Sequence, residues 1–387
     1  MGNGILKSRR FYIALVIFCL LIFSVILYII WLRPLSIDRQ LAYIEAQRAI
    51  PDSENAAVFY RQFFQNFPIP PVSFKYMLGQ QADLNTRRKS WRSSDHPELA
   101  ALIKENHEAI AKFIEITKTK ECRFPIPYAS KQPGDPYAPR TEIREWLFFL
   151  NRAINNDTGD GRAEAAIDKY ACILRLTGNL YQQRVADDYN LATGLETYPS
   201  QTITKLIVEG NMTDAQLDLL SKALLPTNNT WQADWKNMRE IFALCRAKHW
   251  QQLGLINGVK HLVSMFKLRF IYRKYEHPAD RLERQYNRTL AIRRGLHILV
   301  ALRRYRNQQG YWPESLDVIA PLLPAEILND TQRCGTFIYK RLDDDFVLYG
   351  TGPNGVDDGG NGRPAEDVPI WPTSRMLFEK RKKQNAR

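Results

Sequence analysis

The residues that could do chemistry gather most densely in one short stretch, GTGPNGVDDGGNG, at positions 350–362. Six of its thirteen positions are glycine, and four side chains among them carry a carboxylate or amide oxygen: Asn354, Asp357, Asp358 and Asn361. Such oxygens suit hard cations like Ca²⁺, and glycines let a short loop turn its carbonyls inward. Asn-Gly and Asp-Asp-Gly-Gly are also ordinary turn sequences. The composition leaves two interpretations open, an ion-binding loop and a solvated turn.

The same stretch contains the string G-x-G-x-x-G, at Gly350, Gly352 and Gly355. In dinucleotide-binding proteins a helix opens at the third glycine of this string and a second strand completes the unit. Here the third glycine is followed by VDDGGNGRP, which is incompatible with a helix. The sequence therefore disfavours a nucleotide site.

Motifs for catalysis are missing from the sequence. The six histidines include no H-E-x-x-H pair, and there is no nucleophile elbow, P-loop or kinase motif. Asp187 and Asp188 are adjacent, so on a helix they would point in different directions. His297 lies among apolar residues, where we expect a structural histidine. We predict no catalytic residues and infer that the chain is not an enzyme.

Cysteine spacing gives no sign of a metal site. Outside the apolar segment described next, the chain has four widely separated cysteines: Cys122, Cys172, Cys245 and Cys334. None forms a C-x-x-C pair, so we do not expect them to bind a metal. Their disulfide pairing stays open, since four cysteines allow three pairings.

A run of 22 residues without a charge, at positions 11–32, is the strongest compositional signal. A helix of that length, rising about 1.5 Å per residue, would span a bilayer core of roughly 30 Å. A cleaved signal peptide has a shorter apolar region and small residues at its cleavage site, whereas this run ends in bulky side chains. The sequence therefore predicts a retained signal-anchor. Basic residues before it place positions 1–10 in the cytoplasm. We expect a single-pass protein of the inner (plasma) membrane, with the bilayer around residues 11–32 and the bulk of the chain extracytoplasmic or periplasmic.

The body of the chain is predicted to be globular and mainly α-helical. Its 45% hydrophobic and 25% charged residues exclude a disordered chain. Residues 33–285 are expected to form an extracytoplasmic domain of irregular helix pairs, because no fixed repeat period is found. Within it, Tyr60 and Phe63 lie at helical spacing and predict core positions, and Thr213 with Gln216 forms a capping box. Five prolines between positions 124 and 140 predict a loop.

The last hundred residues carry a more specific order of elements. A long helix with Ala291, Ile298 and Leu302 on one face ends at Gly310. YWPESLDVIAPLLP then predicts a short helix beginning at Pro313. Two β-type runs, TFIYKR and FVLYGT, are joined by LDDD and predict an antiparallel hairpin. The glycine-rich stretch follows the second run directly.

This order resembles the globular domain of the type II secretion major pseudopilin, over about a quarter of the chain. The whole chain is similar to a group of uncharacterised bacterial single-pass membrane proteins, which also carry segments like ENAAVFYRQFF. The resemblance implies a small α+β module at 286–370. The residues after it, 371–387, form a basic tail that ends in EKRKKQNAR. It also implies that the loop after the last strand binds one calcium ion, through ligands at Gly350, Thr351, Asn354, Asp357, Asp358 and Asp367.

Charge is unevenly distributed along the chain. The formal net charge is +13, and the segment between Lys267 and Arg306 has 12 basic against 3 acidic residues. Such a run can contact an anionic surface or polymer. No nucleic-acid-binding module is recognisable, so nucleic acid is the less favoured partner.

The leading hypothesis is a membrane-anchored extracytoplasmic interaction or scaffold protein of the cell envelope or secretion apparatus. It would have an unknown protein partner and a calcium-stabilised C-terminal loop. One alternative is a membrane-tethered hydrolase, which should show a pocket in the helical domain where a histidine meets a carboxylate. A weaker alternative is a binder of anionic polymer or nucleic acid that uses the basic segment.

Overall fold

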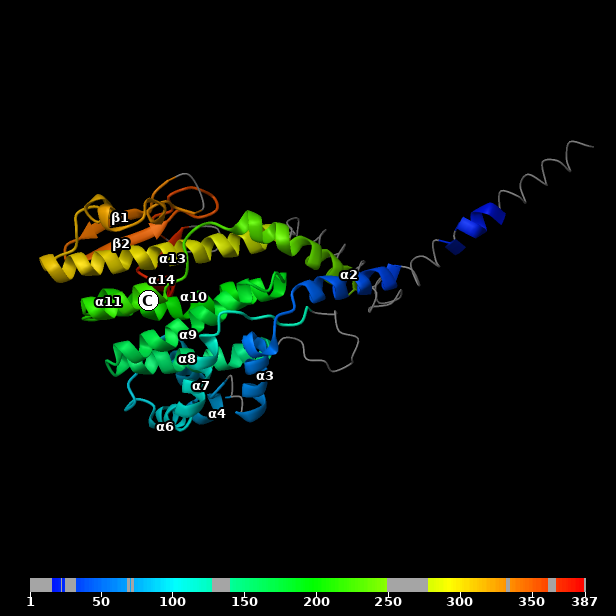
Figure 1. The fold of residues 1–387 in the computed structure, drawn as a ribbon. Coiled ribbons are helices and arrows are strands. Elements are labelled where there is room, and N and C mark those ends of the chain that lie inside the picture. The colour runs from blue at the N-terminus through cyan, green and yellow to red at the C-terminus, as the bar shows by residue number, and fades with distance from the viewer. Residues whose placement is uncertain are drawn as a thin grey trace, which may run out of the picture. The chain divides into compact units, whose positions relative to one another are not determined.

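The computed structural model describes residues 16–21, 23–24, 33–67, 70, 73–126, 140–248, 278–331, 335–360 and 367–385. The described chain is mainly helical and has one small antiparallel sheet (Figure 1). The α-helices with described bounds are α2 Arg33–Gln47, α3 Ala56–Asn66, α4 Lys75–Leu78, α5 Gln80–Arg88, α6 Pro97–Glu105, α7 His107–Thr117, α8 Arg140–Gly159, α9 Ala163–Tyr181, α10 Ala186–Glu209, α11 Asp214–Ala223, α13 Pro278–Gln309 and α14 Ser374–Asn385. Residues 231–248 are also helical. The strands are β1 Ile338–Leu342, β2 Asp345–Gly350 and β3 Val368–Trp371.

The fold class predicted from sequence is wrong in its membrane-spanning part. Among the residues that the structure describes, no helix combines the length and the apolar character needed to cross a bilayer. Only positions 16–21 and 23–24 of the predicted anchor are described, and they are helical. The other positions of the anchor lie outside the described residues. Within the described residues the uncharged run is not matched by a spanning helix, and the single-pass signal-anchor assignment is withdrawn.

The chain divides into two compact units. The smaller comprises residues 1–49, 125–138 and 239–275, and its described part contains α2. There, the Asp38 carboxylate accepts a hydrogen bond of 2.5 Å from Lys248 Nζ, and Glu45 accepts one from the backbone N–H of Ile126. These long-range contacts attach α2 to later segments of the same unit.

The larger unit is a stack of antiparallel helices covered by the sheet (Figure 1). Along this stack α8 packs against α9, α9 against α10, and α10 against α13. The sheet lies on the outer side of α13, with β2 and β3 in contact with that helix. Gly295 of α13 permits this contact, since a Cβ there would lie 2.7 Å from the side chain of Ile370 in β3.

An aromatic cluster fills the core on the other side of the stack. Tyr60 and Phe63 of α3 are buried, as their helical spacing predicts. Their rings lie against Phe113 of α7, with centroids 5.7 and 5.1 Å away, and Phe63 also meets Trp146 of α8 edge-on at 4.9 Å. Such tilted and edge-on pairs stabilise a core beyond their buried area. This cluster fixes α3 and α7 against the long helices.

Three buried arginines of α13 attach the stack to the C-terminal module. Arg293 donates to both carboxylate oxygens of Glu196 in α10, at 2.5 and 2.7 Å. Arg303 donates to the backbone carbonyls of Ile207 and Val208, at 2.6 and 2.8 Å, near the end of α10. Arg294 donates to the carbonyls of Thr227 and Asn329. A guanidinium group has five N–H donors and can therefore hydrogen-bond to several acceptors at once.

The C-terminal sheet differs from the hairpin expected from sequence by one strand. β1 and β2 pair antiparallel across a turn at Asp343 and Asp344, which confirms the predicted hairpin. β3 then pairs antiparallel with β2, giving the order β1-β2-β3. It was missed because it is four residues long and contains Pro369, which cannot donate to a ladder and is tolerated on an edge strand.

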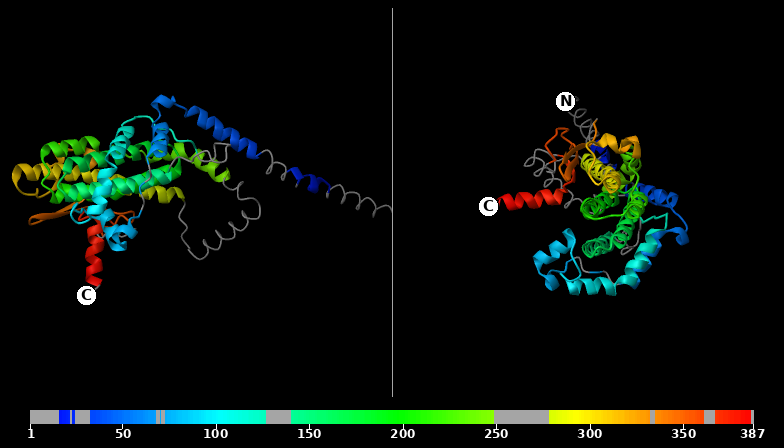
Figure 2. Two further views of the ribbon diagram at one scale, coloured as in Figure 1. Left: turned by 90° about the horizontal axis from the view of Figure 1, so that it is seen from below. Right: turned by 90° about the vertical axis from the view of Figure 1, so that its left-hand side faces the viewer.

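Two other C-terminal elements also differ from expectation. In place of the short helix predicted from Pro313 there are three 3₁₀ turns: Leu316–Val318, Ala320–Leu322 and Ala325–Ile327. Pro321 and Pro324 lack the N–H groups that a continuous α-helix would need. The basic tail contains α14, which projects from the stacked helices of its unit (Figure 2).

Replacing Arg293 by Met should destabilise the fold strongly. It leaves the Glu196 carboxylate, 1% exposed, without its bidentate partner, and breaking a buried ion pair in this way costs about 3–5 kcal/mol. Urea unfolding followed by circular dichroism measures the loss. The double variant Arg293→Met with Glu196→Leu should recover much of it, because no buried charge then remains.

The matched control is Lys205→Met, which removes the exposed pair that Lys205 forms with Glu209 at 3.4 Å. That pair should contribute less than about 1 kcal/mol. Equal losses for Arg293→Met and Lys205→Met would show that the buried pair does not attach α13 to α10 as argued.

Candidate functional site

The glycine-rich stretch forms the connection between β2 and β3. Gly350, the last residue of β2, pairs with Val368 at the start of β3. The loop therefore leaves and re-enters the sheet at neighbouring positions, and the sheet fixes both of its ends. Residues 351–360 and Asp367 are described, while Asn361 lies outside the described residues.

The first two predicted ligands, Gly350 and Thr351, lie against a carboxylate that the sequence did not single out as a ligand. Asp330 Oδ2 accepts a hydrogen bond of 2.6 Å from the Thr351 backbone N–H and another from the Thr351 hydroxyl. A Cβ at position 350 would lie 3.1 Å from Asp330 Oδ1, so glycine allows this close approach. The Thr351 hydroxyl is therefore engaged as a donor to Asp330.

Asp357 lies beside the ring of a strand residue. Its Oδ1 accepts hydrogen bonds from the Tyr349 hydroxyl at 2.8 Å and from the Gly359 N–H at 2.9 Å. These two bonds stabilise the ionised carboxylate and lower the pKa of Asp357. Tyr349 could not be identified as part of the site from sequence, because only the strand register brings its hydroxyl to the loop.

Asn354 and Asp358 contact each other across the loop. Asn354 Nδ2 donates to Asp358 Oδ2 at 2.7 Å, and Asn354 Oδ1 accepts from the Val356 N–H at 3.1 Å. The second bond is an Asx-type turn, which is one of the two interpretations that the sequence left open. These two predicted ligands are therefore close together in an exposed turn.

Asp367 is the most unusual residue of the loop. It is fully buried, and its Oδ2 accepts a hydrogen bond of 2.6 Å from the Gly360 N–H. Gly360 has φ +75° and lies against the Tyr349 ring, so no other residue would fit there easily. Oδ1 of Asp367 has no hydrogen-bond partner in the part of the chain that is described. Burial, with smaller contributions from Asp357 and Asp358, raises the pKa of Asp367.

The oxygen atoms of these loop residues are of the kind that binds calcium, but they do not form a complete coordination shell. Within the described residues, no three His, Cys, Asp or Glu side chains are arranged to hold a metal ion. Calcium also accepts backbone carbonyls and waters, so three carboxylates are not required. What fits the ion is the buried Oδ1 of Asp367, which has no partner among the described residues. Burial raises the pKa of this carboxyl, and the charges of Asp357 and Asp358 add to the effect.

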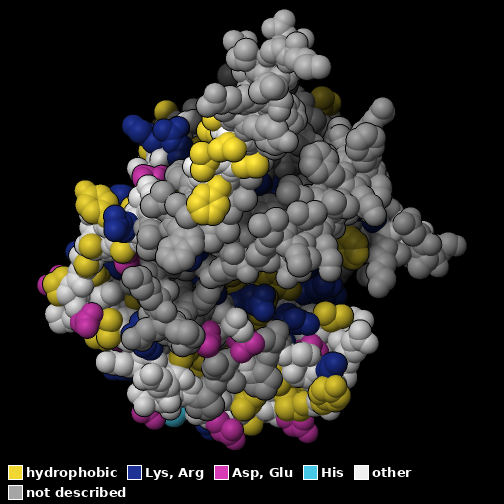
Figure 3. Space-filling model, turned by 90° about the vertical axis from the view of Figure 1, so that its right-hand side faces the viewer, with side chains coloured by type: hydrophobic (Ala, Val, Ile, Leu, Met, Phe, Trp, Pro, Cys, Tyr) yellow, Lys and Arg dark blue, Asp and Glu magenta, His cyan; other side chains and the backbone are white. Residues whose placement is uncertain are grey.

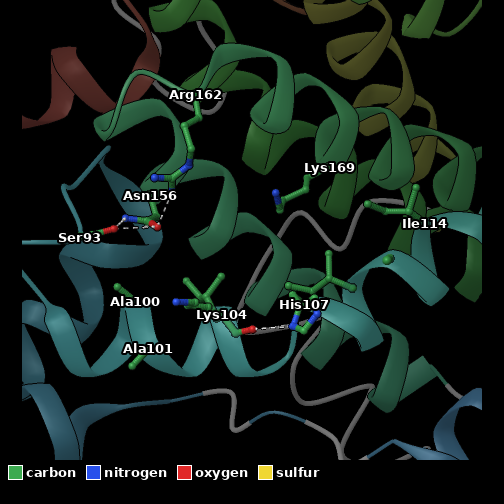
Figure 4. A pocket seen from close by; sticks show the side chains of 12 residues that line it. Ser93, Ala100, Ala101, Lys104, His107, Ile114, Asn156, Arg162 and Lys169 are labelled. Carbon is green, nitrogen blue, oxygen red and sulfur yellow. Dashed lines mark hydrogen bonds between the residues drawn. The ribbon is translucent and has the colours of Figure 1, made fainter.

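A second feature of the larger unit is a groove of about 570 Å³ between α6, α7 and the segment from α8 to α9 (Figure 4). Its floor consists of alanine and isoleucine side chains of α6 and α7. Lys104 and His107 reach it from one side and Arg162 and Lys169 from the other. His107 Nδ1 contacts the backbone carbonyl of Lys104 at 2.9 Å, where a hydrolase would place a carboxylate.

Other groups that could do chemistry are enclosed. Cys172 is fully buried, and desolvation raises the pKa of its thiol to about 12, which makes it a poor nucleophile at neutral pH. Burial also lowers the pKa of His297, whose Nε2 is enclosed on α13. Cys334 lies outside the described residues.

The basic segment between positions 267 and 306 is only partly a surface feature. Its first part, 267–277, lies outside the described residues. In its second part, Arg293, Arg294 and Arg303 are buried and donate to groups of the protein itself. On the face shown in Figure 3, the described basic and acidic side chains are interspersed. No protein-family model, curated protein or solved structure was found to match the chain.

Replacing Asp367 by Asn should stabilise the ion-free protein at neutral pH. Because the folded-state pKa of Asp367 is raised, the folded protein binds the proton more tightly than the unfolded chain does. Stability from this group is therefore lost as pH rises through the raised pKa, and regained on acidification. In chelator, the variant should melt higher than the parent at pH 7, and the difference should shrink toward acid pH.

Differential scanning fluorimetry over a pH series measures this difference. Asp168→Asn, which changes an exposed acid on α9, is the control and should show no such trend. A difference that grows on acidification would mean that Asp367 is stabilised as a carboxylate.

Proposed function

We propose that this chain is a non-catalytic interaction protein whose helical stack offers the binding surface and whose C-terminal α+β module is stiffened by calcium. The observation that carries the calcium part is Asp367, fully buried with Oδ1 unpartnered among the described residues. A buried ionised carboxylate is costly unless a positive charge or enough donors compensate it. The order of long helix, hairpin and acidic loop, and its resemblance to the pseudopilin domain, support the same choice.

Calcium would be bound through side-chain oxygens of Asp367, Asp357 and Asp358, with carbonyls of the loop completing the set. Asp357 uses Oδ1 for its hydrogen bonds with Tyr349 and Gly359, so Oδ2 is the oxygen available in this proposal. The bond between Asn354 and Asp358 would be exchanged for ion contacts. The ion would then neutralise the acidic loop and fix it against β2 and β3.

The role of such an ion is structural. The sheet joins the loop to α13, and α13 is joined to the stack through Arg293 and Arg303. A loop fixed by the ion would therefore rest on a rigid support. An interaction surface that is already ordered loses less conformational entropy when it binds a partner.

The full chain should melt several degrees higher in millimolar CaCl₂ than in EDTA. Binding to the folded state alone stabilises by about 2.7 kcal/mol when the free ion is 100-fold above Kd. Asp357→Ala combined with Asp358→Ala should abolish the shift. Scanning fluorimetry and calorimetry measure it, with MgCl₂ as a comparison, because Mg²⁺ demands a stricter octahedral geometry.

The charge-matched control is Glu164→Ala with Asp168→Ala, which removes two exposed acids of α9 and should leave the calcium shift intact. If the parent shows no shift, calcium has no part in this protein. If the loop variant keeps the shift, the ion binds elsewhere.

A further inference from the structure

The groove between α6 and α7 has the size of a small-molecule site. Its volume of about 570 Å³ lies within the range of roughly 300–1,000 Å³ that is usual for ligand pockets. Its lining is mainly apolar, from Ile103, Ile110 and Ile114 together with three small alanines. The small side chains leave room for a ligand, and the isoleucines offer it an apolar contact. This groove is remote in sequence from the loop at 350–367.

Positive groups surround this apolar floor. Lys104, Arg162 and Lys169 line the groove, and no Asp or Glu is among its lining residues. Figure 4 shows that Lys104 belongs to the α6 side, whereas Arg162 and Lys169 lie opposite. Cations on two sides of an apolar floor suit a ligand with an anionic head and an apolar body.

Each cation keeps donor capacity for a ligand. Lys169 Nζ donates to Asp157 Oδ2 at 2.7 Å, with a longer contact to the Ala165 carbonyl at 3.5 Å, and an ammonium has three hydrogens. Arg162 Nη2 donates to Asn156 Oδ1 at 2.9 Å, while Nη1 and Nε donate to carboxylates, so its two Nη groups still carry one further hydrogen each. Within the described residues, the Lys104 ammonium has no hydrogen bond or ion pair.

The cations that line the groove, taken with the acids that pair with them, favour a ligand with a single negative charge. Lys104, Arg162 and Lys169 contribute three positive charges, and Asp157 and Asp160, which pair with Arg162 and Lys169, contribute two negative ones. Three minus two leaves one positive charge. A monoanion would neutralise the groove, whereas a dianion would leave excess negative charge.

We propose that this groove binds a medium-chain alkyl carboxylate, with the carboxylate at Lys104 and the chain along Ile103, Ile110 and Ile114. This inference goes beyond the proposed calcium-stabilised module and does not depend on it. The apolar floor selects for a chain, and the single residual positive charge selects for a monoanionic head. An amphipathic acidic peptide would be a different class of ligand, which the experiment distinguishes.

Isothermal titration of the full chain with sodium decanoate, in EDTA and below the micellar concentration, tests the proposal. Saturable one-to-one binding is expected. Lys104→Met should weaken it roughly tenfold, as expected for loss of one charge-assisted hydrogen bond. Decanol should bind at least tenfold more weakly than decanoate, and propionate should not bind measurably. Ala111→Trp, which fills the groove, should abolish binding, with its melting temperature recorded to verify folding.

The matched control for Lys104→Met is Lys112→Met, on the adjacent helix α7 and outside the groove lining, which should bind like the parent. The proposal is overturned if decanoate binding is absent, if Lys104→Met and Lys112→Met bind equally, or if decanol equals decanoate. Binding of an acidic amphipathic peptide in place of decanoate would also overturn it. Asp357→Ala with Asp358→Ala should leave decanoate binding unchanged, so this result and that for calcium are separable.

Discussion

The bidentate contact between Arg293 and Glu196 is the interaction on which the larger unit depends. It joins α13 to α10 inside the stack, where neither charge can be left unpaired without a large desolvation penalty. α13 in turn supports the sheet, which approaches closely at Gly295. The loop at 350–367 connects two strands of that sheet. The position of Asp367 is thus set by a chain of contacts that starts at a buried ion pair between two helices of the stack.

The same pair explains why the basic segment could not be interpreted from composition. A run of arginines has the same sequence signature whether its guanidinium groups face water or bind carbonyls inside the protein. Arg303 satisfies carbonyls near the end of α10, which a helix leaves without intrahelical partners. The charge of this segment is used partly to complete the backbone hydrogen bonding of neighbouring elements, so the formal charge overstates what is offered to an external anion.

Several local patterns were predicted correctly, whereas contacts between distant segments were not. The capping box of Thr213 and Gln216, the hairpin and the core positions of Tyr60 and Phe63 depend on neighbours within a few residues, and all three predictions are confirmed. The contacts of Asp330 with Thr351 and of Tyr349 with Asp357 depend on strand register and on how distant segments come together. No local sequence pattern encodes either. The anchor prediction is contradicted, since among the described residues no helix is long and apolar enough to cross a bilayer.

In the proposed calcium site, one set of side chains would govern both the stability of the ion-free protein and its affinity for the ion. Asp367 is destabilising while it is ionised, because its Oδ1 has no partner among the described residues and because Asp357 and Asp358 add like charge to the cost of its burial. The same proximity is what would make a divalent cation bind there. A substitution that relieves the repulsion therefore removes ion affinity as it increases the stability of the ion-free protein. This trade-off between ion affinity and ion-free stability is expected of a ligand-binding site. In a purely structural turn, a stabilising substitution would remove no binding function.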